Sequence, residues 1–378
     1  MRNLVLIFLL CLLTSILIPA SLQSQQLAQL KLALPTEPQL FCGKNRTALV
    51  YDVHLRDSLG RAIKFDSFEI FDDKNNLVYK NNHIEKSIFE GDSNRYVKFV
   101  WIDVNEIPSF ITHKISYKIG KQDYQFSKII KVSPKRKVIS IIPPVQKGIW
   151  YVGNAPADSS HHRMTHTEFI SVYDSLQDGY IIGYNNQRFA MDFSKLGKEG
   201  RKANNGGKYN SDYNDYGENV VAVADGKVVA VMDFIPDNPN PPYRKSHWDI
   251  DSICGNYIAL NIGDSLIALY AHIKPNSIKV KAGDIIKKGT IIGKIGNSGK
   301  SSGAHLHFQI SKFKVPYKES GNSFLSEGIS FVFDNYISYS WQTGFDWHNA
   351  NDTDSLKFLN PQEIKNRLPY FNEIIEIK

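Results

Sequence analysis

The chain has 378 residues, which is more than one hydrophobic core usually serves, so two domains with appendages are expected. A hydrophobic content of 42% excludes a disordered or low-complexity protein. The formal net charge of +7 is spread along the chain, which argues against a nucleic-acid-binding surface. Such a charge is compatible with an anionic partner, such as a membrane or a bacterial envelope.

The first residues predict export. Met1-Arg2-Asn3 gives a short positive start, and an almost uninterrupted apolar run follows over residues 4–18. This pattern is typical of a secretory signal peptide, placed here at residues 1–25, with an uncleaved membrane anchor as the alternative. We therefore expect an exported protein of the periplasm, the cell envelope or the extracellular space. Cys42 and Cys254 would then enter an oxidising compartment, where they could pair.

Residues 30–133 have the pattern of a small β-domain. Short runs rich in valine, isoleucine, tyrosine and phenylalanine alternate with turn-forming residues, which predicts strands at 48–55, 67–71, 96–102, 114–119 and 124–132. Strands at this spacing predict an immunoglobulin-like β-sandwich. A charged stretch with several prolines at 134–146 predicts the linker to a second domain, over residues 147–378.

The second domain is also predicted to be mostly β, so the fold class of the whole chain is mainly β. Its expected strands are 219–224, 227–232, 257–262, 265–273, 290–295 and 305–310. Asp225-Gly226 separates the first two and predicts a β-hairpin. One helix is expected over 362–368, because Asn360-Pro361 suits a helix cap and first turn.

The motif His305-Leu306-His307-Phe308 has the clearest chemical meaning. On a strand, His305 and His307 would project to one face while Leu306 and Phe308 face the core. One imidazole can then bind a metal while the other takes a proton from water bound to that metal. The preceding Gly299-Lys300-Ser301 is similar to the end of a phosphate-binding loop, but Lys294 stands where that loop needs glycine.

A catalytic zinc ion usually has three protein ligands, so further candidates are needed upstream. Asp192 lies in a strand-like run among hydrophobic neighbours. His161 and His162 lie in a polar loop just after the linker, and His272 ends an apolar strand. An imidazole in that last position is costly to bury without a partner.

Four sequence elements stand in a fixed order between residues 216 and 308. They are Tyr216-Gly217-Glu218-Asn219 continuing to Gly226, Gly255-Asn256-Tyr257-Ile258, Tyr270-Ala271-His272-Ile273, and Gly283-Asp284 continuing to Phe308. This block resembles the lysostaphin- or LytM-type zinc metallopeptidases, family twenty-three of the metallopeptidases, over most of residues 150–334. The resemblance implies an antiparallel β-sheet groove domain of the duplicated hybrid motif type. It also implies cleavage of peptide cross-links or stem peptides of bacterial peptidoglycan, through a water molecule activated by Zn²⁺.

The resemblance also implies a role for each candidate residue. His307 and Asp192 match zinc ligands, and His305 matches the general base. His272 matches the second catalytic histidine, which helps to bind the water or stabilises the oxyanion. In the common pattern a histidine precedes the aspartate by four residues, but Arg188 stands there.

The segment Ser160-His161-His162-Arg163 is similar to a branch of the family in which a His-Arg pair lies far ahead of the aspartate. This similarity implies His162 as the third zinc ligand, with His161 as the competing choice. Zinc would then be held by His162, Asp192 and His307.

Other functions stay open beside the endopeptidase. A catalytically degenerate member that binds the wall or activates an amidase is the alternative to which Arg188 points. Residues 280–289 resemble biotinyl and lipoyl carrier domains, but export and the His-x-His motif argue against a carrier. The expected partners are peptidoglycan peptides, with no nucleic acid and only transient membrane contact through the signal segment.

Overall fold

The computed structural model describes most of the chain after residue 29. The described residues are 30–81, 85–86, 95–133, 138–164, 174–177, 180–182, 185–197, 200–239, 252–313, 326–341 and 357–378. The predicted signal peptide lies outside them, as do residues 134–137 of the predicted linker. Within the described residues, no helix combines the length and the apolar character needed to cross a membrane.

The first part of the chain consists of two β-sheets around one core. One sheet has the order β1-β3-β7-β6, with β2 also paired to β3, and the other has the order β5-β4-β8-β9. Inward-facing residues such as Tyr51, Val53, Phe68 and Ile115 fill the space between them. The five strands predicted here are present. The bounds are β1 (Leu30–Ala33), β2 (Gln39–Cys42), β3 (Thr47–Asp57), β4 (Lys64–Phe71), β5 (Leu77–Asn81), β6 (Glu85–Lys86), β7 (Arg95–Asp103), β8 (Phe110–Ile119) and β9 (Gln122–Lys131).

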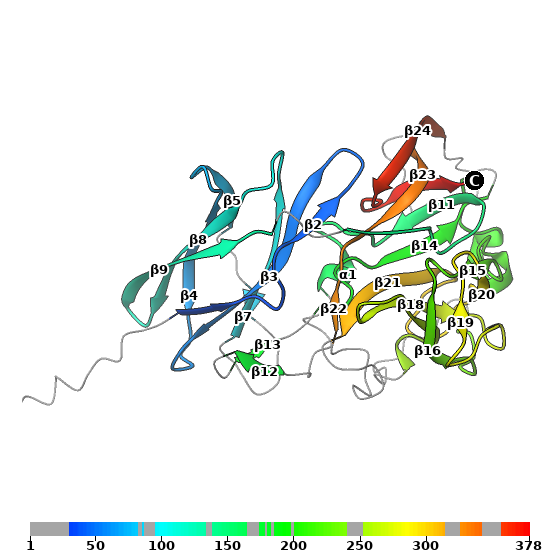
Figure 1. Ribbon diagram of the computed structural model, residues 1–378, viewed down its shortest axis with the longest axis horizontal. Coiled ribbons are helices and arrows are strands. Elements are labelled where there is room, and N and C mark those ends of the chain that lie inside the picture. Colours follow the sequence, from blue (N-terminus) through cyan, green and yellow to red (C-terminus); the bar gives the residue numbers. More distant parts are fainter. Residues whose placement is uncertain are drawn as a thin grey trace, which may run out of the picture.

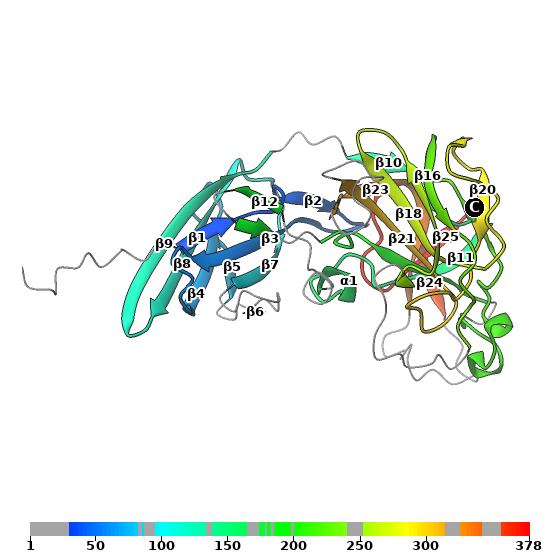
Figure 2. The ribbon, with the colours of Figure 1, turned by 90° about the horizontal axis from the view of Figure 1, so that it is seen from below.

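The second part is built on a larger sheet, seen beside the first part in Figures 1 and 2. Its order is β10-β23-β25-β11-β14-β21-β18-β17-β16-β19, with β22 paired to β21 and β24 paired to β23. The central strands β11, β14, β21 and β18 carry the buried hydrophobic core. The bounds are β10 (Ile139–Ile141), β11 (Gly148–Gly153), β14 (Met191–Lys195), β16 (Gly226–Met232), β17 (Asn256–Asn261), β18 (Leu266–Ile273), β19 (Ile285–Ile286), β21 (Leu306–Phe313), β22 (Ser326–Gly328), β23 (Phe331–Trp341), β24 (Phe358–Arg367) and β25 (Glu373–Ile377).

Short elements complete the second part. They are the helix α1 (His161–Met164), the pair β12 (Asp174–Gln177) and β13 (Tyr180–Ile182), the pair β15 (Asn219–Val221) and β20 (Ile291–Lys294), and two 3₁₀ turns at Asn205–Gly207 and Asn210–Asp212. The described part of the chain is therefore mainly β, as the sequence predicts.

The hairpin predicted at Asp225-Gly226 is wrong. β15 pairs with β20, whereas β16 pairs with β17 and β19, so the strands on either side of this turn lie in different sheets. The Asp225 carboxylate accepts hydrogen bonds from the Lys288 backbone N–H and the Lys287 ammonium. A Cβ on Gly226 would lie 2.4 Å from the Asn261 carbonyl oxygen. Close packing of β16 on β17 therefore requires the glycine.

The helix predicted over 362–368 is also wrong, because this segment belongs to strand β24. β24 pairs antiparallel with β23, and Ile364 packs against the core from the position opposite Tyr336. Asn360-Pro361 lies at a register shift in this pair, and Asn360 has a φ of 49°. Proline is tolerated at such a bulge on an edge strand. An isolated helix of this length is only marginally stable, so pairing with the longer strand β23 is favoured over helix formation.

The two parts of the chain share one hydrophobic cluster. Phe41, Ala48, Val50 and Trp101 of the first part belong to the same buried cluster as the core of the second part. β2 lies between the two parts in both views (Figures 1 and 2). Its Gln39 side chain donates to the Gly328 carbonyl at 2.8 Å and accepts from the Ser330 backbone N–H at 3.0 Å. The first part is therefore packed firmly against the second.

A buried arginine also joins the two parts. Arg188 Nε donates to Glu327 Oε1 at 2.7 Å, and the same guanidinium donates to the carboxylate of Asp52 on β3. All three side chains are buried. Burial raises the pKa of Glu327 to about 7; Arg188 opposes this rise and Asp52 adds to it.

Glu327→Gln is expected to change how stability depends on pH. The native pKa of Glu327, about 7, exceeds its ordinary value of 4.5, so acidification from about pH 7 to about pH 4.5 protonates the native state before the unfolded chain. Relative to the variant, the wild-type protein should therefore gain roughly 1–3 kcal/mol of unfolding free energy across this window. Urea unfolding of both proteins at the two ends of the window measures it. Equal pH dependence in the two proteins would contradict the expectation.

Candidate metal centre

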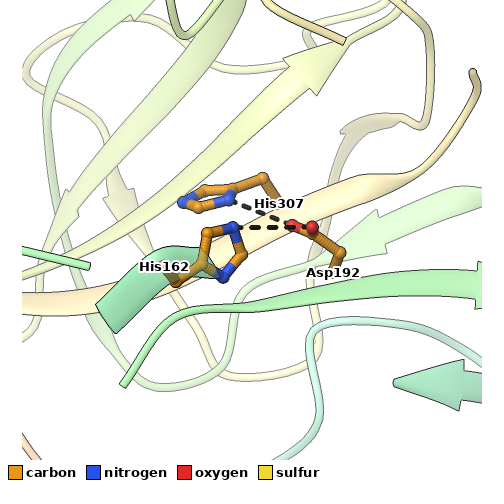
Figure 3. Close-up of side chains that lie close together, drawn as sticks. All are labelled: His162, Asp192 and His307. Carbon is orange, nitrogen blue, oxygen red and sulfur yellow. Dashed lines mark hydrogen bonds and ion pairs between the residues drawn. The ribbon is translucent and has the colours of Figure 1, made fainter. Parts of the chain in front are cut away.

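Three side chains from distant segments meet on one face of the large sheet (Figure 3). Asp192 lies on β14, His307 lies on β21, and His162 lies on α1. The His307 Nδ1 atom is 3.1 Å from Asp192 Oδ1, and the His162 Nε2 atom is 3.5 Å from Asp192 Oδ2. One nitrogen or oxygen atom from each of the three residues lies within 4.8 Å of the others, which is close enough to hold one metal ion.

Strand pairing explains how two of these residues meet. β14 and β21 are antiparallel neighbours, and Asp192 stands directly opposite His307. Leu306 and Phe308, on either side of His307, are fully buried in the core. The predicted alternation is therefore confirmed from Leu306 to Phe308, and it places His307 on the face that carries Asp192, whereas His305 lies just ahead of the strand.

Hydrogen bonds fix the orientation of both histidine rings. His162 Nδ1 lies 3.0 Å from the Asn154 carbonyl oxygen, and His307 Nε2 lies 3.0 Å from Gln309 Oε1. The Asn154 carbonyl oxygen can only accept, which places the proton of a neutral His162 on Nδ1. His307 lies between two acceptors, because Asp192 Oδ1 is 3.1 Å from its Nδ1. With a cation between His307 and Asp192, the His307 proton would lie on Nε2, beside Gln309. Metal-binding histidines are typically held by a second group in this way.

His305 and His272 lie beside the three clustered residues. His305 Nε2 is 3.7 Å from Asp192 Oδ1, and the ring centroids of His305 and His272 are 4.8 Å apart. His305 Nδ1 is 2.8 Å from the Gly303 carbonyl oxygen, and His272 Nδ1 is 2.8 Å from that of Ser298. The structure therefore brings all five predicted site residues together.

His272 has an unusual backbone conformation. Its φ of 61° lies in the left-handed region, which a histidine seldom occupies. It lies within a register shift between β17 and β18. Its N–H donates to the Cys254 carbonyl, and its own carbonyl accepts from the Gly296 N–H. Backbone of this kind costs about 1–3 kcal/mol and tends to occur at functional sites.

The charges of the site suit a metal ion. Burial lowers the pKa of His162 to about 4, and the Asp192 carboxylate offsets this only in part. Burial, with His305 and His307 adding to it, holds the pKa of His272 well below its ordinary value. Burial alone would raise the pKa of Asp192, but the neighbouring histidines outweigh it and hold that pKa well below its ordinary value. Neutral imidazoles beside a carboxylate are the protonation states that metal binding requires.

The structure separates the two candidate histidines of α1. His162 is 8% exposed and faces Asp192, whereas His161 is exposed and lies outside the cluster. Arg188 points into the buried contact with Glu327 and Asp52, away from a ligand role. The sequence prediction missed Asn154 and Gln309. Gln309 lies two residues after His307 on the same strand face, so alternation alone could have found it.

Both described cysteines, Cys42 and Cys254, are free thiols. Burial raises the pKa of Cys254 to about 11, so its thiol is protonated near neutral pH.

Residues 212–319 match the family model described as Peptidase family M23. These residues therefore form a peptidase family M23 domain. The matched segment includes His272, His305 and His307, whereas His162 and Asp192 lie ahead of it.

Two curated proteins are similar to a short stretch of this chain. An uncharacterized metalloprotease of Buchnera aphidicola is 45% identical over 56 residues, which is 15% of this chain and 14% of that protein. The peptidoglycan DD-endopeptidase ShyA of Vibrio cholerae is 36% identical over 56 residues, 15% of this chain and 13% of ShyA. The catalytic domain of lysostaphin from Staphylococcus simulans is a similar solved structure, with 24% identity and a TM-score of 0.21, over 44% of this chain and 79% of that domain.

Proposed function

We propose that the protein is a zinc-dependent endopeptidase that cleaves peptide cross-links or stem peptides of bacterial peptidoglycan. The observation that carries this proposal is the meeting of His162, Asp192 and His307, with His305 and His272 beside them. The match of residues 212–319 to the M23 family model supports the reaction class, and the similarity to ShyA, a peptidoglycan DD-endopeptidase, supports the substrate class.

The residues present fit a zinc ion. Two imidazoles and one carboxylate form a donor set that catalytic zinc sites use, with a fourth position left for water or substrate. The Asn154 carbonyl oxygen and the Gln309 amide oxygen can each accept the N–H of one ring, so both rings could present a lone pair to a cation beside Asp192. When bound there, zinc would act as a Lewis acid and lower the pKa of a coordinated water to about 7.

The chain's own histidines would handle the protons. The Gly303 carbonyl holds the Nδ1–H of His305, so His305 Nε2 faces the site and can accept a proton from the attacking water. The Ser298 carbonyl holds the Nδ1–H of His272 in the same way, and its lowered pKa keeps that ring neutral. A neutral His272 offers an acceptor at Nε2, which favours orienting the water over stabilising an oxyanion.

The position of Arg188 supports an active peptidase over a catalytically degenerate scaffold. Arg188 is the departure from the common family pattern that pointed to lost activity. In this chain Arg188 serves the buried contact between the two parts, and His162 occupies the space beside Asp192 instead. A ligand supplied from α1 would complete the proposed site.

The remaining sequence predictions form part of the same proposal. We propose export through residues 1–25, an immunoglobulin-like domain at 30–133, a linker at 134–146 and a peptidase domain at 147–378. The sheet orders β1-β3-β7-β6 and β5-β4-β8-β9 support the immunoglobulin-like domain. They correspond to the strand orders A-B-E-D and C′-C-F-G of the immunoglobulin fold.

His305→Ala is expected to keep zinc and lose hydrolysis. Loss of the proton acceptor should lower the rate of peptide release from purified sacculi by about 100-fold to 10,000-fold, because His305 contacts the ligand set without belonging to it. Mass spectrometry of released fragments and metal analysis of the same samples measure both effects. Zinc-loaded wild-type protein that releases nothing from sacculi of several wall chemotypes would favour the scaffold and contradict the proposal.

A further inference from the structure

One residue contacts two of the three clustered side chains. The Asn154 carbonyl oxygen accepts the Nδ1–H of His162 at 3.0 Å, and the Asn154 amide Nδ2 donates to Asp192 Oδ2 at 2.8 Å. The same carbonyl also accepts the Ser160 hydroxyl at 2.7 Å. Asn154 thus links the segment that carries His162 to the strand that carries Asp192.

The backbone explains how one residue reaches both. Asn154 directly follows β11, whose last residue, Gly153, stands opposite Asp192 across the sheet. Its φ of 47° turns the chain out of the strand, so that its carbonyl faces α1 while its side chain lies along Asp192. Asparagine is one of the few residues that adopt this left-handed conformation readily.

The two contacts have different chemical effects. The carbonyl can only accept, so it places the proton of His162 on Nδ1 and leaves Nε2 facing Asp192. The amide N–H stabilises the Asp192 carboxylate as an anion and fixes its rotation, with Oδ1 toward His307 and Oδ2 toward His162. The imidazole orientation and the carboxylate orientation are therefore set by one side chain and its own backbone.

We propose that Asn154 is a positioning residue of the metal centre, which aligns His162 and Asp192 for a shared cation. This inference rests on the proposed function, because it assumes that zinc is the cation. Groups that orient metal ligands typically contribute about 10-fold to 100-fold to metal affinity.

Asn154→Gly isolates the side chain, because glycine keeps the positive φ and the carbonyl but removes the amide. Asn154→Ser is the second variant, since its hydroxyl is too short to replace the amide. Asn75→Gly is the matched control: Asn75 is an exposed turn asparagine with a φ of 61°, in the first part of the chain. Three measurements compare these variants. Zinc affinity is measured by chelator competition on the full chain, and the absorption spectrum of the cobalt-substituted protein reports ligand geometry. Urea unfolding of the zinc-free proteins checks the fold.

Both Asn154 variants should fold, lose about 10-fold to 100-fold in zinc affinity and show an altered cobalt spectrum, whereas Asn75→Gly should match the wild type. Wild-type affinity and spectrum in the Asn154 variants would overturn the positioning role. Variants that unfold as zinc-free proteins would assign Asn154 to the fold and overturn it as well. A wild-type chain that binds zinc but cuts no sacculi would overturn the proposed function alone, and one that binds no zinc would overturn both.

Discussion

His162→Ala is expected to abolish zinc binding and peptidoglycan cleavage together, whereas His161→Ala should leave both at the wild-type level. His162 Nε2 faces Asp192 Oδ2 at 3.5 Å from a buried ring, but His161 is exposed and outside the cluster. Loss of a group that only orients a metal ligand can lower metal affinity by roughly 100-fold, and loss of the ligand itself should lower it further. Metal analysis after dialysis and the rate of fragment release from sacculi measure the two effects on the same samples.

A combined variant sharpens this test. Arg188 stands where the common family pattern has a histidine. Arg188→His together with His162→Ala would therefore restore that pattern in the sequence. The side chain at 188 points to Glu327 and Asp52, so zinc binding should not return. Recovery of zinc in the double variant, or loss of zinc in His161→Ala alone, would contradict the assignment of His162.

Arg188→Met is expected to cause the largest loss of stability among single substitutions at the contact between the two parts. It removes the cation that the buried carboxyl groups of Asp52 and Glu327 share, while leaving both groups buried. Breaking a buried ion pair by removing one partner costs about 3–5 kcal/mol, a large share of the total stability of a typical domain. Urea unfolding near neutral pH measures the loss.

An exposed ion pair provides the control for this substitution. Lys287 and Asp225 form a pair whose side chains are 78% and 61% exposed, so Lys287→Met should leave the unfolding midpoint unchanged. If Arg188→Met had the same urea midpoint of unfolding as the wild type, the buried contact of Arg188 with Asp52 and Glu327 would not hold the two parts together.

Local pattern was sufficient for most of the strands but not for their pairing. Runs rich in β-branched and aromatic residues predicted β3, β7, β18 and β21, because the side chains of these strands fill the hydrophobic cores. It failed at Asp225-Gly226, where the neighbouring strands pair with distant partners, and over 362–368, where pairing with β23 outweighed the helix signals. Both errors arise because local signals do not encode partners far along the chain.

The site shows the same limit. The His-x-His spacing predicted that His305 and His307 lie together, and Asp192 and His162 were candidate ligands. Only the family resemblance assigned these two their roles, since their approach depends on the β14–β21 register and on α1. Nothing local marked the positive φ of His272 or the double contact of Asn154. The burial of Arg188 was equally hidden, because its carboxylate partners lie 136 and 139 residues away in the sequence.

A zinc-edge anomalous difference map from crystals of the wild-type protein grown with zinc tests the metal centre most directly. We expect a single strong peak in this region, about 2.0–2.1 Å from His162 Nε2 and His307 Nδ1 and about 2.0–2.2 Å from an Asp192 carboxylate oxygen. No peak between these three residues, or a peak bound through His161 in place of His162, would contradict the proposed centre.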